Sequence, residues 1–216
     1  SQDHKRAYNG DAGPNTGGMG AYSPAPVVTD EIHQRIMDEV IYPTVEGMAS
    51  EGHPYTGFLY AGLMIDETGT PKVIEYNCRF GDPETQPMML RLQSDLVELI
   101  EAANRVELDK TTIEFDSRAA VGVVLAAKGY PGDYPKGDAI SGLKVNYPAD
   151  EKVFHAGTKQ DGENVVTAGG RVLCATALGN TVTEAQQRAY ELVKQISWEG
   201  MEYRTDIAYR AIAREQ

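Results

Sequence analysis

Three polar side chains alternate at the end of an expected strand: Glu75, Asn77 and Arg79 follow the apolar residues Val73 and Ile74. Residues two apart on a strand point to the same face, so the Glu75 carboxylate and the Asn77 amide oxygen should lie side by side. Mg²⁺ prefers oxygen ligands and usually takes only one or two carboxylates from a protein, completing its shell with phosphates and water. With Arg79 on the same face, the pattern predicts a metal–nucleotide site. For an isolated trio, a solvated strand end with one salt bridge is the more common interpretation.

A tight turn is predicted directly after these residues, at Gly81, Asp82, Pro83 and Glu84. It brings two more carboxylates close to an expected helix start at Pro87, where they can accept hydrogen bonds from an amine or a hydroxyl group. The alternative is helix capping, because acidic side chains are favourable at a helix N-terminus. Both roles can coexist.

Residues 13–20, Gly-Pro-Asn-Thr-Gly-Gly-Met-Gly, form a loop within the Gly- and Pro-rich first 26 residues. Ordinary connections take only a handful of residues, so a loop of this length indicates a purpose. Glycine lets backbone N–H groups approach an anion closely, as in an anion-binding nest. We expect Asn15, Thr16, Gly17 and Gly18 to cover a bound substrate. A flexible linker is the default interpretation of such a loop taken alone.

The elements that must position these residues alternate between helical and extended patterns. Thr29 is the expected N-cap of a helix with Asp30 and Glu31 in its first turn. Pro43 predicts a kink or a break in that helix. Further along we expect a β-hairpin formed by residues 57–66 and 72–76, and a helix over about 87–105 with a restart at Ser94.

The composition changes near residues 111–117. Beyond them, Ala119–Ala127 has the continuous apolar character of a buried strand, and Thr181 and Glu184 form a capping box before the last long helix. Short strands are expected at 153–158, 164–166 and 171–177, with Gly169-Gly170 as a hairpin turn. We predict an α/β (α+β) fold in two domains, residues 1–116 and a β-rich domain with one main helix, residues 117–216.

The charge balance excludes one class of partner. With 32 acidic and 20 basic residues the net charge is −12, which repels a nucleic-acid backbone but not a small nucleotide that arrives with Mg²⁺. The sequence shows no membrane span and no signal-peptide pattern, so no membrane partner is expected. Cys78 and Cys174 lie far apart without metal-site spacing, which predicts two free thiols in a reduced, cytoplasmic protein.

Residues 79–86, Arg-Phe-Gly-Asp-Pro-Glu-Thr-Gln, resemble the signature of the phosphoribosylamine–glycine ligases, also called glycinamide ribonucleotide synthetases. Further segments along the chain also resemble this family. They are SQDHKR at 1–6, GPNTGGMGAYSP at 13–24, YTGFLYAG at 55–62, GYP at 129–131, VFHAGT at 153–158, GGRVL at 169–173, and the residues near 203–207. The resemblance therefore covers essentially the whole chain, and its motifs together are highly specific.

The resemblance implies the C-terminal part of an ATP-grasp domain followed by a small β-rich domain. The implied reaction belongs to de novo purine synthesis. ATP phosphorylates the carboxylate of glycine, and the amine of 5-phosphoribosylamine attacks the glycyl phosphate, giving glycinamide ribonucleotide, ADP and phosphate. By the same resemblance, Glu75 and Asn77 are the ligands of Mg²⁺ or Mn²⁺, and through this metal they hold the ATP phosphates, while catalytic Arg79 stabilises the acyl phosphate or its adduct.

The resemblance also assigns residues that carry no such pattern of their own. Asp3, His4 and Lys5 match the family's Asp-His-Lys stretch near the phosphates and substrate, with Lys5 expected in catalysis and the other two in substrate binding. The substrate-binding set further includes the loop residues 15–18 and Asp82, Pro83 and Glu84. Without the family, residues 4–6 would be read as a solvated basic end with a surface histidine.

Two features depart from the family pattern. Many ATP-grasp enzymes carry another acidic metal ligand on the preceding strand, whereas residues 57–65 hold no carboxylate before Asp66. Family members are also about twice as long, and the missing part is expected at the amino terminus, where it holds the lid that grips adenine. The chain should therefore begin inside a longer protein. We expect a monomer whose missing domains pack against this part, and no activity from this part alone.

Two alternatives stay open. Another ATP-grasp carboxylate–amine ligase, such as one acting on a carboxyaminoimidazole, is disfavoured by the Gly-Asp-Pro-Glu turn. A non-catalytic module that kept the fold is disfavoured by the intact trio of Glu75, Asn77 and Arg79. In the second half, His155 is expected to be structural, and a role for Arg171 near the substrate or the nucleotide is open.

Overall fold

The computed structural model of the protein describes residues 1–144 and 146–215, and it divides into two compact units. Unit 1 comprises Ser1–Pro24, Asp82–Arg91 and Asp116–Gln216, and unit 2 comprises Ala25–Gly81 and Leu92–Phe115. The units are interleaved along the chain, so compactness does not follow a linear cut at residue 116. The division into domains 1–116 and 117–216 stays a prediction. The predicted mixed α/β class is confirmed.

Unit 1 is built on a five-stranded sheet in which all neighbouring strands are antiparallel. The strand order is β1 (Gln2–Asp3), β4 (Gly20–Ser23), β7 (Ala119–Ala126), β11 (Arg171–Gly179) and β8 (Glu151–His155). The two strands from the beginning of the chain therefore complete a sheet whose other strands come from the second half.

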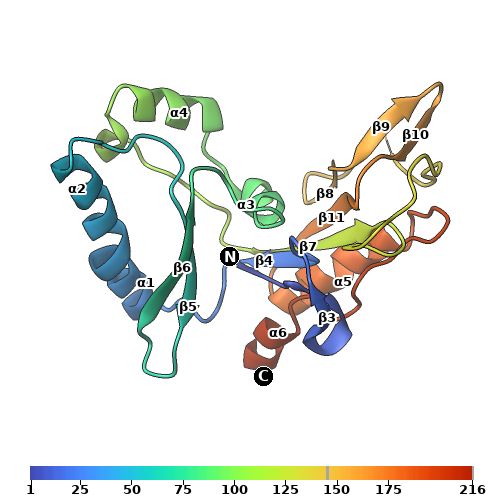
Figure 1. Cartoon of the computed structure of the whole chain (residues 1–216), viewed down its shortest axis with the longest axis horizontal. Coiled ribbons are helices and arrows are strands. Elements are labelled where there is room, and N and C mark those ends of the chain that lie inside the picture. The colour runs from blue at the N-terminus through green and yellow to red at the C-terminus, as the bar shows by residue number, and fades with distance from the viewer. Residues whose placement is uncertain (145, 216) are drawn as a thin grey trace. The chain divides into compact units, whose positions relative to one another are not determined.

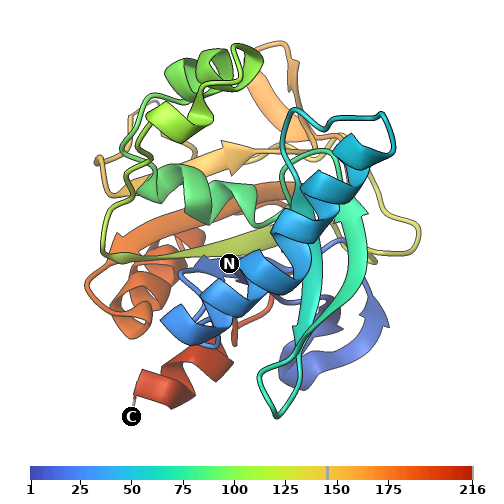
Figure 2. The ribbon, with the colours of Figure 1, turned by 90° about the vertical axis from the view of Figure 1, so that its left-hand side faces the viewer.

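The central strand β7 shows why this sheet forms. Its sequence AAVGVVLA is buried at every position, because α5 (Val182–Val193) and α3 (Thr85–Arg91) both pack on it and cover opposite faces of the sheet (Figures 1 and 2). Strands buried on both faces read as continuous apolar runs. Gly122 allows the close approach of α3, since a Cβ there would lie 3.2 Å from Cγ of Pro87.

A capping box has two hydrogen bonds, and the start of α5 forms one of them as predicted. The Thr181 hydroxyl accepts a hydrogen bond from the Glu184 N–H at 3.1 Å. The Glu184 carboxylate reaches back to the N–H of Asn180 at 2.8 Å, one residue earlier than a standard box. The helix then buries Ala185, Ala189 and Leu192 against the sheet.

Smaller elements surround the sheet in unit 1. They are the hairpin β2 (Arg6–Tyr8) and β3 (Ala12–Asn15) with the 3₁₀ turn η1 (Asn9–Asp11), the hairpin β9 (Thr158–Asp161) and β10 (Asn164–Thr167), and the C-terminal helix α6 (Tyr209–Glu215). The predicted hairpin turn at Gly169-Gly170 is wrong, because β10 pairs with β9 while β11 pairs with β7 and β8. The two glycines instead join strands of different sheets.

Unit 2 combines helices with a two-stranded sheet. Its elements are α1 (Asp30–Ile36), the π-helical turn η2 (Met37–Ile41), α2 (Tyr42–Ser50), β5 (Tyr60–Ile65), β6 (Pro71–Asn77), α4 (Leu96–Asn104) and the 3₁₀ turn η3 (Leu108–Lys110). The predicted hairpin is confirmed as β5 and β6, and the predicted cap is confirmed because the Thr29 hydroxyl accepts from the N–H of Ile32 at 3.3 Å. Pro43 does not break the helix: it lies in the first turn of α2, directly after the π-helical turn.

The helix expected over residues 87–105 is two helices. α3 ends at Arg91, and α4 begins after Asp95, whose carboxylate accepts from the N–H groups of Val97 and Glu98. The predicted restart at Ser94 is thus confirmed to within one residue. Among the described residues, no helix has the length and apolar character needed to cross a membrane.

Candidate functional site

The predicted metal ligands lie in unit 2, at the end of β6. Glu75 and Asn77 are two apart on this strand and share a face. Across the hairpin, Glu75 pairs with Gly62, where a Cβ would lie 3.0 Å from Cγ of Glu75. The glycine therefore leaves room for the Glu75 side chain to lie over β5.

The donor set fits a hard divalent cation. Glu75 is exposed, and the Nδ2 atom of Asn77 is buried without a hydrogen-bond partner among the described residues. This N–H₂ group is a hydrogen-bond donor, so the partner it lacks would be an acceptor such as a phosphate oxygen, and a cation would be bound by the amide oxygen instead. No cluster of three or more His, Cys, Asp or Glu side chains suited to a metal occurs among the described residues. A cation here would take most of its oxygen ligands from phosphates and water, as Mg²⁺ commonly does.

Asp66 does not supply the acidic ligand that is missing from β5. Its Oδ1 atom accepts hydrogen bonds from the N–H groups of Thr68 at 2.9 Å and Thr70 at 3.0 Å, and its Oδ2 atom lies 3.1 Å from Nζ of Lys72. Bonds from the Thr68 hydroxyl and Thr70 N–H, together with Lys72, hold the pKa of Asp66 well below its ordinary value. The carboxylate is therefore committed to the hairpin turn.

Arg79 lies just beyond β6, also in unit 2. Its guanidinium is exposed and donates one hydrogen bond to the carbonyl of Phe80 at 2.9 Å. The ring of Phe80 packs on Phe58 with centroids 4.1 Å apart, which anchors the segment after the strand. The other N–H groups of Arg79 make no hydrogen bond within the described residues, so its predicted contact with a phosphoryl group stays a prediction that this geometry allows.

The residues matched at the start of the chain lie in unit 1 and differ in exposure. Nζ of Lys5 is exposed and lies 2.6 Å from Oδ2 of Asp3. His4, between them, is only 3% exposed, and its Nε2 atom accepts a hydrogen bond from the Ala208 N–H at 2.9 Å. Burial, followed by the nearby Arg204, lowers the pKa of His4 to about 4. The ring is thus neutral near pH 7 and ties β1 to the C-terminal segment. Its role in substrate binding stays a prediction, and the burial favours a supporting role.

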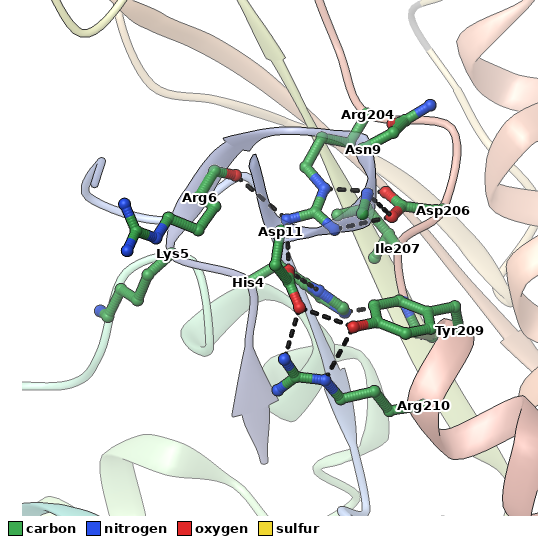
Figure 3. Close-up of polar contacts among 12 residues, drawn as sticks. His4, Lys5, Arg6, Asn9, Asp11, Arg204, Asp206, Ile207, Tyr209 and Arg210 are labelled. Carbon is green, nitrogen blue, oxygen red and sulfur yellow. Dashed lines mark hydrogen bonds and ion pairs between the residues drawn. The ribbon is translucent and has the colours of Figure 1, made fainter. Parts of the chain in front are cut away.

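A closed polar network surrounds this histidine (Figure 3). The fully buried Arg204 donates to both carboxylate oxygens of Asp206 at 2.8 Å, to Asp11 at 2.9 Å and to the carbonyl of Arg6 at 3.1 Å. Burial alone raises the pKa of Asp11, but hydrogen bonds from Tyr209 and Arg204 outweigh it and lower that pKa to about 2. The sequence indicated that residues near 203–207 belong to a motif, but assigned them no role.

The two predicted substrate segments meet in unit 1. We call residues 15–18 the glycine loop and residues 82–84 the acidic turn. Gly18 has φ +122°, and a Cβ there would lie 2.3 Å from Cδ of Pro83, so the loop packs directly on the turn. Glu84 is buried directly before α3, whereas the side chain of Asp82 is half exposed.

The backbone of the glycine loop does not form the predicted anion-binding nest. Its N–H groups already donate within the protein: Thr16 to the carbonyl of Lys5 at 2.7 Å, Gly17 to the Tyr130 hydroxyl at 3.0 Å, and Gly18 to the Thr16 hydroxyl at 2.9 Å. The side chain of Asn15, at the end of β3, is exposed to solvent. The nest is not formed because the amides of Thr16 and Gly17 are taken by other segments and that of Gly18 by Thr16 itself. The role of residues 15–18 in substrate binding stays a prediction.

Arg171 joins the glycine loop and the acidic turn. It donates to the carbonyls of Gly17 at 2.9 Å and Asp82 at 2.9 Å, and to the Asp82 carboxylate at 2.8 Å. From the sequence, a role for this residue near the substrate or the nucleotide was left open. A separate cavity of about 540 Å³ in unit 1 is lined by Tyr8, Met19, Tyr130, Glu202, Tyr203, Arg204 and neighbouring residues, and by none of the predicted site residues.

Comparisons with known proteins identify both the structural class and the family of this chain. Residues 1–85 match the model of the phosphoribosylglycinamide synthetase ATP-grasp (A) domain, which places Glu75, Asn77 and the glycine loop in an ATP-grasp region. Residues 120–210 match the C domain of the same synthetase. The chain belongs to the phosphoribosylglycinamide synthetase family.

Relatives and solved structures agree with this family. A phosphoribosylamine–glycine ligase of Vibrio parahaemolyticus is 72% identical over 216 residues, covering 100% of this chain and 50% of that protein. The one of Salmonella typhimurium is 68% identical over 217 residues, with 51% of its length covered. The crystal structure of the Thermotoga maritima phosphoribosylamine–glycine ligase matches with a TM-score of 0.80 and 39% identity, covering 96% of this chain and 50% of that chain. The chain thus spans about half the length of the relatives it matches.

A more distant neighbour shows the fold alone. The biotin carboxylase domain of the 2-oxoglutarate carboxylase from Hydrogenobacter thermophilus matches with a TM-score of 0.61 at 16% identity, covering 86% of this chain and 40% of that chain.

Proposed function

We propose that the full-length protein containing this chain joins glycine to 5-phosphoribosylamine with ATP, giving glycinamide ribonucleotide, ADP and phosphate. The observation that carries the proposal is the match of both family models to one chain that keeps Glu75, Asn77 and Arg79. This chain would supply the metal ligands and part of the substrate site. Because it spans half the length of its relatives, the residues that grip adenine belong to the other half, and this part alone should be inactive.

The proposed chemistry needs positioning and charge neutralisation rather than a side-chain nucleophile. Glu75 and Asn77 would hold Mg²⁺ or Mn²⁺, which when bound offsets the negative charge of the ATP phosphates. Arg79, exposed next to this pair, would stabilise the charge that builds on the transferring phosphoryl group and on the glycyl phosphate. The half-exposed carboxylate of Asp82 would accept hydrogen bonds from the amine or the hydroxyls of phosphoribosylamine, and Lys5, held by Asp3, would contact a phosphate.

A substrate-omission assay on the full-length protein tests the proposal. ADP release is measured with ATP, Mg²⁺, glycine and freshly formed phosphoribosylamine, and the amide product is identified by mass. We expect product only when both substrates are present. ADP release that requires a different acid or amine would assign the protein to another carboxylate–amine ligase activity, and nucleotide binding without turnover would indicate a non-catalytic module.

We further infer a monomeric, cytoplasmic protein. Cys78 and Cys174 are free cysteines, as expected for a reducing compartment. Burial raises the pKa of Cys174 to about 12, so this thiol stays protonated and unreactive. Light scattering on the full-length protein measures the oligomeric state, and a stable dimer would contradict the inference.

A further inference from the structure

Arg171 is placed where three segments distant in sequence come together. It is the first residue of β11, next to an irregularity in the pairing of that strand with β7. From there its Nη1 atom reaches the carbonyls of Gly17, Gly18 and Asp82 at 2.9, 3.4 and 2.9 Å, and its Nη2 atom reaches Oδ2 of Asp82 at 2.8 Å. One side chain therefore bonds both the glycine loop and the acidic turn.

The fit depends on glycine at both loop positions. A Cβ on Gly17 would lie 2.8 Å from Cζ of Arg171, and a Cβ on Gly18 would lie 2.3 Å from Cδ of Pro83. The guanidinium is planar and carries five N–H donors in a fixed fork, so it can hold several carbonyls and a carboxylate in one arrangement. A lysine ammonium has three donors on a flexible stem and cannot span the same set.

We propose that Arg171 is a positioning residue of the ligation reaction, fixing the glycine loop against the acidic turn so that both present one arrangement to the amino-acid and amine substrates. This inference rests on the proposed function. The hydrogen bonds of Arg171 go to the backbone of the glycine loop and to Asp82, so it would act on substrate through these two segments and not by direct contact.

Arg171 should matter more for placing the substrate contacts than for the stability of the fold. Side-chain exposure is 20% for Arg171 and 54% for Asp82, so the ion pair itself contributes little to stability. The structural loss on removing Arg171 is mainly that of its hydrogen bonds to the carbonyls of Gly17, Gly18 and Asp82. In contrast, misplacing a substrate contact by about 1 Å can cost on the order of 100-fold in rate. Loss of Arg171 should therefore change substrate use far more than it changes unfolding.

Kinetics of the full-length protein test this prediction with Arg171→Met and Arg171→Lys. We expect Arg171→Met to lower kcat/KM for glycine and phosphoribosylamine by about 100-fold. The KM for ATP should stay nearly unchanged, and Arg171→Lys should restore part of the loss. Arg188→Met is the matched control. Arg188 is another partly exposed arginine of unit 1, which donates to the carbonyl of Leu178 at 2.9 Å and to Glu151 at 3.1 Å, away from both segments.

Amide hydrogen exchange provides a readout that does not depend on turnover. The amides of residues 16–18 should exchange faster in Arg171→Met than in the unchanged protein or in Arg188→Met. Equal kinetic losses in the two arginine variants, or unchanged exchange in the glycine loop, would overturn the proposal. If the unchanged protein forms no glycinamide product, the proposed function fails, and the exchange data alone then decide whether Arg171 fixes the two segments.

Discussion

The polar network around Arg204 in unit 1 and the Glu75–Asn77 pair in unit 2 use similar side chains in opposite ways. Arg204 is buried, and its donors are matched by Asp11, Asp206 and a backbone carbonyl. In the pair of predicted metal ligands, the Glu75 carboxylate is exposed, and the Asn77 amide nitrogen is buried without a partner among the described residues. Groups whose bonding capacity is used up internally hold the fold, whereas groups left open are available to a ligand.

The glycine loop and the acidic turn fall between these extremes. The loop amides and the Arg171 donors are committed within the protein, but the side chains of Asn15 and Asp82 face solvent. Such an arrangement suits a substrate contact that must be rigid without being buried. Substitutions in the three regions should therefore differ in whether they affect turnover or folding.

The largest effect on turnover should come from removing the charge of the predicted metal ligand Glu75. Glu75→Gln in the full-length protein removes the charge that attracts a divalent cation, so turnover should fall by about a thousandfold. The melting temperature should stay unchanged because Glu75 is exposed. Glu67→Gln, an exposed glutamate in the turn of the same hairpin, is the control and should retain full turnover. Near-normal turnover of Glu75→Gln would place the metal elsewhere.

In the polar network around Arg204, by contrast, a substitution should lower the stability of the fold. Arg204→Met leaves the carboxylates of Asp11 and Asp206 without their buried partner, which should cost about 3–5 kcal/mol in the free energy of unfolding. Denaturant unfolding monitored in unit 1 measures this loss. Arg35→Met, which breaks an exposed pair with Glu39 in unit 2, should have a much smaller effect. Comparable losses in the two variants would remove the distinction between the regions.

Packing between the glycine loop and the acidic turn gives the third prediction. Gly18→Ala places a methyl group 2.3 Å from Cδ of Pro83 at φ +122°, so the free energy of unfolding should fall by about 2–4 kcal/mol. Gly10→Ala isolates the backbone strain, because Gly10 has φ +67° with nothing within 4 Å of the added Cβ, and it should cost only about 1 kcal/mol. Equal costs would show that the loop does not pack on Pro83 in solution.

The smallest effect is a dependence on pH. Burial and Arg204 lower the pKa of His4 to about 4, whereas the ring takes up a proton near its ordinary value of 6.5 when unfolded. The unfolded chain therefore binds more protons between these values, and stability from this group is complete above pH 6.5 and declines as the pH falls toward 4. The loss between pH 6.5 and 4.5 should be about 2 kcal/mol.

His4→Gln tests the assignment of this pH dependence. It keeps an acceptor for the Ala208 N–H but does not titrate, so its unfolding should depend less steeply on pH in this window. Asp11 does not interfere, since its pKa is about 2. Identical pH profiles for the two proteins would mean that another group titrates.

Local patterns were sufficient to predict the secondary structure that positions the metal pair. The hairpin of β5 and β6, the caps at Thr29 and Thr181, and the buried strand β7 were all predicted, because strand alternation, capping hydrogen bonds and apolar runs are set by neighbouring residues. The same alternation put Glu75 and Asn77 on one face. At Pro43 the sequence predicted a kink or a break: the chain stays helical through this residue, and the irregularity is a π-helical turn directly before it.

The sequence by itself determined which residue types stand at the strand end and in the glycine loop, and hence the family. Only the tertiary structure decided that His4 is buried on Ala208, that the Gly17 amide is bonded to Tyr130, and that Arg171 links Gly17 to Asp82. Each of these contacts joins residues far apart in the chain: β1 and β4 enter a sheet with β7, and Arg171 reaches back to the loop from β11. Such pairings depend on how the whole sheet assembles, which no local pattern of residues encodes.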